Sequence, residues 1–213
     1  MWDNSRVIAV TSRHRRGQAM TREEYLEQIQ IICASKPLAL ILREKDLTPG
    51  EYETLAKMVL KICEREKVTG ILHNFKTVAE TMECDRIHLP LEELRKLRPD
   101  EKHRYQVLGT SVHSLEDAIE AEGLGATYLS AGHIFATSCK PGIPPRGLEF
   151  LRKICTAVKI PVYGIGGIPL EEQILQQIYH QGAAGACVMS GFMEMKRSSH
   201  IHGEQDCLQT GIL

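Results

Sequence analysis

Residues 161–191 carry the pattern that decides the fold, and they read PVYGIGGIPLEEQILQQIYHQGAAGACVMSG. An apolar, β-rich run over 161–165 ends in a glycine turn, and an amphipathic segment follows over 170–180. A second apolar run over 185–189 ends in Ser190 and Gly191. Two apolar strands joined by a helix predict a βαβ unit, whose parallel strands are covered on both faces.

The same alternation extends over the rest of the chain. Further apolar runs that predict strands lie at 6–11, 38–43, 70–74, 86–89, 106–110 and 128–132. Helical patterns lie between them, after Thr21 and over 51–66, 114–123 and 147–158, with shorter ones over 76–82 and 91–97. Thr21 and Glu24 have the spacing of a capping box, which marks the start of the first helix.

Strands that alternate with helices fit either a closed barrel or an open, doubly wound sheet. The number of strands favours the barrel, and so does the lack of a GxGxxG turn after the first strand. We therefore predict a single (β/α)8 TIM barrel over residues 1–195, followed by a polar tail over 196–213.

The composition excludes several classes of function. Lys and Arg number 26 against 27 Asp and Glu, so no global field recruits nucleic acid or a membrane surface. The start of the chain does not resemble a signal peptide, and no apolar stretch approaches the roughly 18 residues that cross a bilayer. The chain has 7 cysteines and no CxxC pair, which favours reduced thiols in a cytoplasmic protein.

Function in a closed parallel barrel gathers at the C-terminal ends of the strands. Gly166 and Gly167 follow the seventh predicted strand, and Met189, Ser190 and Gly191 end and follow the eighth. Glycines let a backbone approach a ligand closely, and adjacent N–H groups can surround a phosphate. A tight βα turn accounts for either loop alone, but the pair predicts a phosphate site.

Charged and titratable side chains follow other strands. Arg43 and Lys45, after the second strand, would share one face and could meet an anion, although a solvated strand end explains them equally well. His73 and His88 stand at the ends of the third and fourth strands, where a single histidine is more often structural than catalytic.

The sixth strand leads into the densest polar stretch, residues 132–140. His133 can exchange a proton near neutral pH, and Lys140 could bind a carboxylate or phosphate, with Thr137 and Ser138 nearby. Cys139 could act as a nucleophile, but the sequence shows no activating base beside it.

Taken together, these strand ends resemble the superfamily of thiamine phosphate synthase and thiazole tautomerase (TenI). The matching pieces are LREK at 42–45, HN at 73–74, IHL at 87–89, GTSVHS at 109–114, GHIFATSCK at 132–140 and IGGI at 165–168. The resemblance and the strand-end positions together predict substrate binding by Arg43, Lys45, Asn74, Ser111, Thr137, Ser138, Lys140, Gly166, Gly167, Met189, Ser190 and Gly191.

The resemblance offers two enzymatic branches. The synthase joins hydroxymethylpyrimidine diphosphate to thiazole phosphate, releases pyrophosphate and uses Mg²⁺. Its metal carboxylates fall at Phe75 and Glu93 here, and loss of a carboxylate at Phe75 removes a hard oxygen ligand from the ion. The synthase also tends to have a hydroxyl residue at the position of Cys139.

The tautomerase branch is favoured by Gly132-His133, because the synthase usually has Gly-Pro there. That enzyme converts a thiazole phosphate carboxylate to its aromatic isomer without a metal or redox cofactor. We therefore expect a tautomerase in which His133 moves the proton, with the synthase, and Mg²⁺, as the alternative. A non-catalytic regulatory barrel that binds thiazole phosphate is a third reading, and association into a homo-oligomer is expected from the family.

Overall fold

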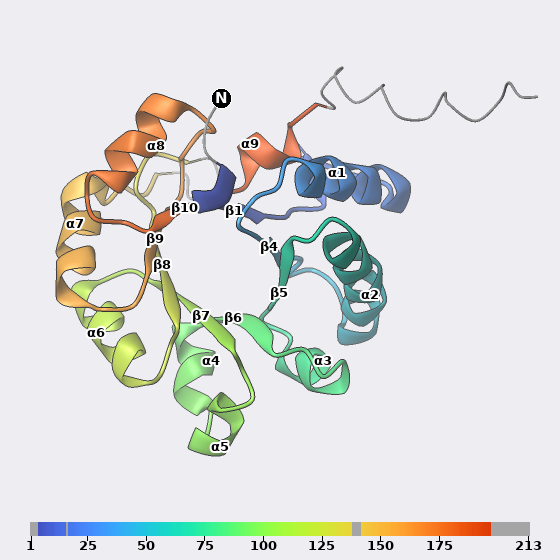
Figure 1. Ribbon diagram of the computed structural model, residues 1–213, viewed down its shortest axis with the longest axis horizontal. Helices are drawn as coiled ribbons and strands as arrows, with labels where there is room; N and C mark the ends of the chain where they lie inside the picture. Colours follow the sequence, from blue (N-terminus) through green and yellow to red (C-terminus); the bar gives the residue numbers. More distant parts are fainter. Residues whose placement is uncertain (1–3, 16, 138–141, 197–213) are drawn as a thin grey trace, which may run out of the picture.

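The structure is a computed structural model that describes residues 4–15, 17–137 and 142–196. Eight parallel strands form a closed barrel in the order β1-β10-β9-β8-β7-β6-β5-β4, and helices surround it (Figure 1). The barrel strands are β1 Val7–Val10, β4 Ala39–Leu42, β5 Thr69–His73, β6 Arg86–Pro90, β7 Val107–Val112, β8 Tyr128–Gly132, β9 Val162–Ile165 and β10 Gly185–Val188. The predicted TIM barrel is confirmed.

The helices follow the expected alternation. They are η1 Asn4–Arg6, α1 Arg22–Ala34, α2 Pro49–Arg65, α3 Lys76–Thr81, α4 Leu91–Lys96, α5 Pro99–Lys102, α6 Leu115–Gly123, α7 Gly147–Ala157, α8 Glu172–Tyr179 and α9 Ser190–Met193. The capping box of Thr21 and Glu24 is present at the start of α1, and Thr48 with Glu51 makes a second one at α2. Each box pairs backbone N–H groups that a helix start leaves without intrahelical partners.

One small element lies outside this alternation. The strands β2 His14–Arg15 and β3 Gln18–Ala19 form an antiparallel hairpin between β1 and α1. Its two-residue strands are too short to show a period of two, so the sequence pattern predicts no strand in this segment. Among the described residues, no helix is long and apolar enough to span a bilayer.

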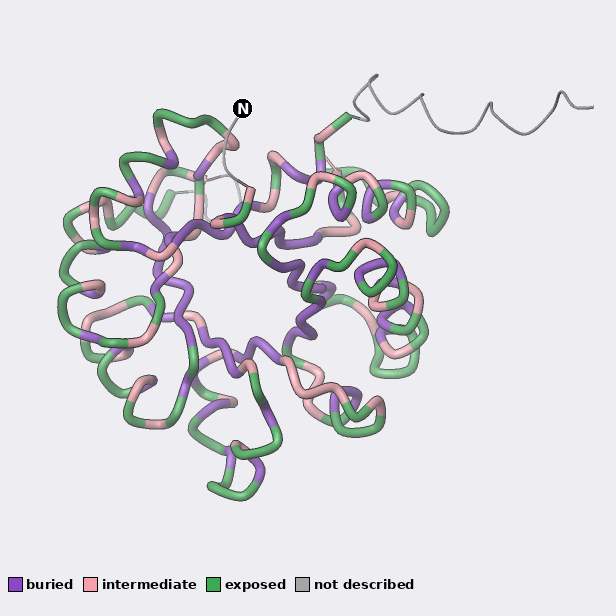
Figure 2. The backbone as a smooth tube through the Cα atoms, viewed as in Figure 1, coloured by how far each residue is buried: buried purple, intermediate pink, exposed green. Residues whose placement is uncertain are grey.

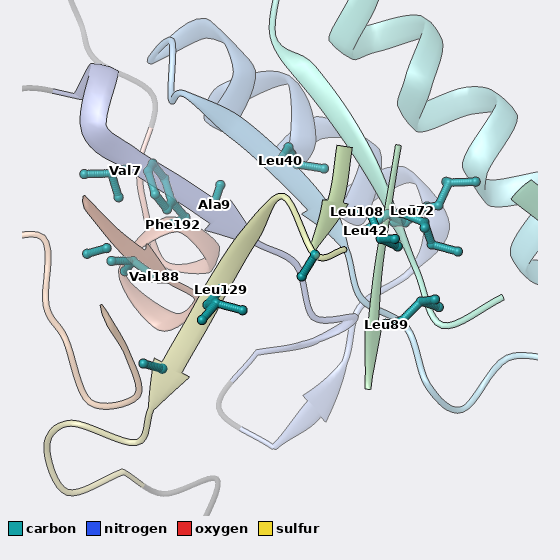
Figure 3. Packing of buried hydrophobic residues seen from close by; sticks show 14 of the residues in the cluster. Val7, Ala9, Leu40, Leu42, Leu72, Leu89, Leu108, Leu129, Val188 and Phe192 are labelled. Carbon is teal, nitrogen blue, oxygen red and sulfur yellow. The ribbon is translucent and has the colours of Figure 1, made fainter. Parts of the chain in front are cut away.

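Successive side chains of each strand alternate between the helix layer and the barrel interior. Leu40, Leu42, Leu72, Leu108 and Leu129 belong to the large cluster between strands and helices, which Figure 3 shows at close range. Figure 2 shows that buried residues follow the ring of strands while exposed ones lie on the outer faces of the helices. Burial on both faces is the reason that these strands read as continuous apolar runs.

The barrel interior changes in character along its axis. A second, smaller cluster fills its lower part, and it contains Ile8, Ala39, Ile41, Ile71 and Tyr128. Toward the C-terminal ends, the inward positions that continue this alternation are polar on several strands, namely Arg43, His73, His88, Ser111 and Ser130. An apolar plug therefore supports a polar mouth.

Candidate active site

The end of β4 is anchored by a buried carboxylate, that of Glu44, and the cations Arg43 and Lys45 lie on either side of it in the sequence. Glu44 is 3% exposed. It accepts hydrogen bonds from the Thr11 hydroxyl at 2.6 Å, the Tyr25 hydroxyl at 2.8 Å and the Arg13 N–H at 2.8 Å. Arg43 directly follows β4 and continues its alternation on the face opposite to Glu44, whereas Lys45 lies in the turn that comes next. The charges of Arg43 and Lys45 both act on His73, so the two cations lie near the same histidine, and their role in anion binding stays a prediction.

Two histidines lie beside these cations. The rings of His73 and His88 stack with centroids 5.7 Å apart. Burial, followed by the charges of His88, Arg43 and Lys45, lowers the pKa of His73 to about 2. Burial and the charge of Arg43 lower the pKa of His88 to about 3. Both imidazoles are therefore neutral in the folded protein at ordinary pH, and neither adds to the positive charge of the mouth.

His88 is also part of a hydrogen-bond network across β6, β7 and β8. Its Nδ1 lies 2.8 Å from the Tyr128 hydroxyl and its Nε2 lies 2.9 Å from the Ser111 hydroxyl. The hydroxyls of Ser111 and Ser130 are 3.0 Å apart. Ser111, a predicted substrate-binding residue, is the least buried of the four. The network joins residues up to 42 positions apart in the chain, and sequence reasoning missed Tyr128 and Ser130.

The opposite side of the mouth is built from backbone. Gly166 and Gly167 have φ angles of 96° and 67°, a region that favours glycine. Their amide N–H groups donate no hydrogen bond to the described part of the chain. Ser190 and Gly191 open α9 next to them, so their N–H groups precede the first intrahelical bond. The two predicted glycine loops are thus adjacent, on the neighbouring strands β9 and β10.

A small cavity lies beside the second of these loops. It has a volume of about 40 Å³, and Ser12, His14 and Arg15 face Met189 and Ser190 across it. The cavity brings the β2–β3 hairpin next to the expected phosphate loop. No local sequence pattern indicates this contact, because it depends on how the hairpin packs next to the loop after β10.

The loop after β8 packs tightly against the first glycine turn. The N–H of Ile134 donates to Ile165 and that of Phe135 donates to Gly166, at 2.9 and 3.0 Å. A Cβ atom on Gly167 would overlap the carbonyl oxygen of Ala136, and one on Gly166 would overlap the Cβ of His133. The two glycines therefore have a packing role as well as free amides.

His133 is held inside this loop. Its side chain is largely buried, with 5% of the residue exposed. Its Nε2 lies 3.2 Å from the carbonyl oxygen of Ile143, which can only accept, so Nε2 carries the proton. The imidazole thus ties the beginning of the β8–α7 loop to its far end.

The remaining predicted residues are distributed around the rim. Asn74 follows β5 in the left-handed conformation, with φ 67°, and is exposed. Thr137 and Met189 are half-buried. Ser138, Cys139 and Lys140 lie outside the described residues, as does the tail from 197 onward.

The residues that the resemblance assigns to Mg²⁺ do not form a metal site. Phe75 stacks on Tyr52 with ring centroids 4.1 Å apart. Glu93 accepts a hydrogen bond from Lys96 at 2.6 Å on the exposed side of α4. The described residues contain no group of three or more His, Cys, Asp or Glu that could hold a metal ion. Within the described residues, the positions of Phe75 and Glu93 therefore do not supply the carboxylate pair that a hard divalent cation prefers.

Comparisons with known proteins show what the chain is similar to. Residues 7–192 match the family model for thiamine monophosphate synthase. A thiamine-phosphate synthase 2 of Streptococcus pneumoniae is 32% identical over 194 residues, which cover 89% of this chain and 88% of the relative. A thiamine-phosphate synthase of Clostridium acetobutylicum is 35% identical over 161 residues, or 73% of this chain and 74% of that one.

A solved structure agrees with these matches. Thiamine phosphate pyrophosphorylase from Pyrococcus furiosus superposes with a TM-score of 0.73 at 26% identity, covering 91% of this chain and 90% of that chain. The expected superfamily, an enzyme superfamily of thiamine biosynthesis, is confirmed.

The expectation of a tautomerase is wrong, because the relatives at this level of identity are thiamine-phosphate synthases. It depended on the dipeptide Gly132-His133, for which the structure offers a packing explanation. A Cβ atom on Gly132 would overlap the carbonyl oxygen of Ile165, and His133 binds the Ile143 carbonyl. The glycine is thus required by the close approach of β9, and the histidine has a structural contact in the loop that does not depend on the reaction.

Proposed function

This chain belongs to the thiamine monophosphate synthase family, and from that premise we propose that it is a thiamine-phosphate synthase. In the proposed reaction the C–O bond between the pyrimidine methylene carbon and its diphosphate breaks. The ring nitrogen of the thiazole phosphate bonds to that carbon, and pyrophosphate leaves. The observation that carries this proposal is the match to synthases over nearly the whole barrel.

The mouth offers a separate place for each of the two anionic groups. The free amides of Gly166, Gly167, Ser190 and Gly191 are suited to the thiazole phosphate, because adjacent N–H groups and a helix start favour an anion. Arg43 and Lys45 lie on the other side, where they would neutralise the diphosphate and the charge that grows on it as the bond breaks. Thr137, Ser138 and Lys140 remain predicted contacts.

The neutral imidazoles suit a pocket that must not bind the leaving group too tightly. His73 and His88 carry no charge beside Arg43, so the positive charge of this side comes from Arg43 and Lys45. A substrate ring can contact the hydroxyl of Ser111, which is half-buried and lies 3.0 Å from the buried hydroxyl of Ser130. Holding both substrates by their anionic ends brings the reacting carbon and nitrogen together, which is catalysis by positioning.

The test is a direct assay of condensation. The purified full chain is incubated with pyrimidine diphosphate, thiazole phosphate and Mg²⁺, and thiamine phosphate and pyrophosphate are measured by chromatography. The proposal expects the two products in equal amounts. A matched control is Lys57→Met, which removes an exposed cation on α2, paired with Glu53 at 2.7 Å, and should leave turnover unchanged.

Other outcomes would contradict the synthase proposal. Tight binding of thiazole phosphate without any condensation would favour a regulatory barrel instead. Failure of both condensation and binding, in protein that melts cooperatively, would remove the family activity from this chain.

A further inference from the structure

The hydrogen bonds of the side-chain network on β6, β7 and β8 all run in one donor-to-acceptor direction. This direction follows when every buried hydrogen atom of the network is assigned an acceptor. Tyr128 is 6% exposed, His88 3% and Ser130 1%, so three of the four members are buried. Only Ser111 is half-buried. A buried donor without an acceptor is costly, so the arrangement that pairs every buried hydrogen is strongly preferred.

The direction begins at Tyr128. Its ring enters the barrel because Gly109, its partner in register on β7, has no side chain, and a Cβ there would overlap the ring. Within the described residues, the single hydrogen-bond partner of its hydroxyl is Nδ1 of His88, at 2.8 Å. If the phenol only accepted, its own proton would be buried without a partner. Tyr128 therefore donates to Nδ1.

The imidazole of His88 continues this donor-to-acceptor direction from Tyr128 to Ser111. A neutral histidine has one N–H, so a ring that accepts at Nδ1 carries its proton on Nε2. Burial and the charge of Arg43 keep His88 neutral by lowering its pKa to about 3. Nε2–H therefore donates to the Ser111 hydroxyl oxygen, 2.9 Å away.

Ser130 completes the count. Its hydroxyl lies 3.0 Å from the Ser111 oxygen and 3.4 Å from Nε2 of His88. Because Nε2 is a donor, the proton of Ser130 has its acceptor at Ser111. Ser111 then accepts two hydrogen bonds, and its own O–H is directed out of the network, toward the barrel mouth.

We propose that Tyr128 and His88 are positioning residues that hold Ser111 as a one-way hydrogen-bond donor to a ring nitrogen of the pyrimidine substrate. The proposal rests on the synthase function. The thiazole nitrogen uses its lone pair to form the new bond, so it cannot stay an acceptor. The ring nitrogens of the pyrimidine keep their lone pairs throughout the reaction, so they fit a fixed donor.

The tautomer of His88 in the free protein is the first test, and it does not depend on activity. Long-range proton–nitrogen spectra of the full chain labelled with ¹⁵N-histidine report which ring nitrogen carries hydrogen, and His88→Gln identifies the signal. We expect a protonated Nε2 and an unprotonated Nδ1. A protonated Nδ1 would overturn the relay even if the protein is an active synthase.

Kinetics of Tyr128→Phe provide the second test. The variant keeps the aromatic ring but loses the hydroxyl that donates to Nδ1 of His88. The tautomer with the proton on Nε2 therefore loses a hydrogen bond, and the fraction of His88 with its proton on Nδ1 should increase. The KM for the pyrimidine diphosphate should rise about five- to ten-fold, with kcat and the KM for thiazole phosphate within about two-fold, because the lost contact is equal in ground and transition states. An unchanged KM in a variant with an altered tautomer would overturn the assignment of Ser111 as the donor.

The matched control is Thr110→Val, which removes the neighbouring hydroxyl on the other face of β7. Thr110 is fully buried and donates to the Leu89 carbonyl at 2.8 Å, away from the network. It should lower stability without changing the tautomer or either KM. If the tautomer is as expected but no thiamine phosphate forms, the synthase proposal fails while the directed donor stands.

Discussion

The two halves of the barrel mouth are built on different principles. Between β5 and β8 the surface consists of side chains, His73, His88, Ser111 and Ser130, which are hydrogen-bonded or stacked on one another. Between β9 and β10 it consists of backbone, where Gly166 and Gly167 leave their amides without partners in the described chain. A side-chain surface can be changed one contact at a time, whereas a backbone surface depends on the whole path of the chain.

The largest effect is expected on the backbone half. Gly167→Ala would place a Cβ against the Ala136 carbonyl at a φ of 67°, so both overlap and strain oppose it. We expect a loss of about 3–4 kcal/mol in the free energy of unfolding, measured by urea denaturation. Gly125→Ala is the control, since its φ is 92° with nothing within 4 Å, and it should cost only about 1–2 kcal/mol. Equal losses of stability in Gly167→Ala and Gly125→Ala would show that the backbone at Ala136 can move away from the new Cβ at little cost.

Arg43→Met should have the next largest effect, and on turnover rather than folding. Removing a charged contact to the diphosphate should lower kcat/KM about 100-fold. The variant should also raise the pKa of both His73 and His88, since the charge of Arg43 lowers each of them. The readouts are steady-state kinetics and a histidine titration by NMR. A drop below five-fold would place the diphosphate elsewhere.

Acid should destabilise the side-chain half specifically. The pKa values of His73 and His88 are lowered to about 2 and about 3 from 6.5, so below pH 6.5 the unfolded chain binds protons that the folded chain does not. The stability present above pH 6.5 is therefore lost as the pH falls, by about 2 kcal/mol for each histidine between pH 6.5 and 5. Urea denaturation at the two pH values measures it.

The control for this pH dependence is His88→Gln, which should remove about half of the change between pH 6.5 and 5. A wild-type stability that stays flat over this range would mean that water reaches both rings.

Ser130→Ala should give the smallest effect. It removes one of the two hydrogen bonds that Ser111 accepts, without exposing a buried donor. We expect a loss of about 1 kcal/mol in stability and a change in KM of about three-fold or less. The His88 tautomer should be unchanged, in contrast to Tyr128→Phe. A change in the tautomer of His88 would mean that Ser130, rather than Tyr128, determines which ring nitrogen carries the proton.

The same contrast explains how far the sequence could lead. The strands were predicted to within a residue or two, because strands buried on both faces read as apolar runs. The glycine loops and Arg43 could be predicted as site residues because each is a local motif at a strand end. Tyr128 was not, because its role depends on the register between β7 and β8, which places it opposite Gly109.

His133 shows the opposite error. A histidine at a strand end reads as a proton carrier, but its contact with Ile143 lies ten residues along a loop whose path no local pattern indicates. The carboxylate of Glu44 was read only as part of a charged strand end. Two of its three hydrogen bonds come from Thr11 and Arg13 in the segment after β1, and the third comes from Tyr25 in α1, far from Glu44 in the sequence.

The space that Gly109 leaves for Tyr128 also sets how deep the mouth is. The phenol ring of Tyr128, on β8, supports His88 from inside the barrel through a hydrogen bond. It occupies the space that Gly109, on β7, leaves by having no side chain. The two positions therefore form a volume-exchanging pair, and a larger residue at 109 demands a smaller one at 128. Shortening Tyr128 alone would leave a space next to Gly109 and remove the hydrogen bond between its hydroxyl and His88, so the network would lose its support from inside the barrel.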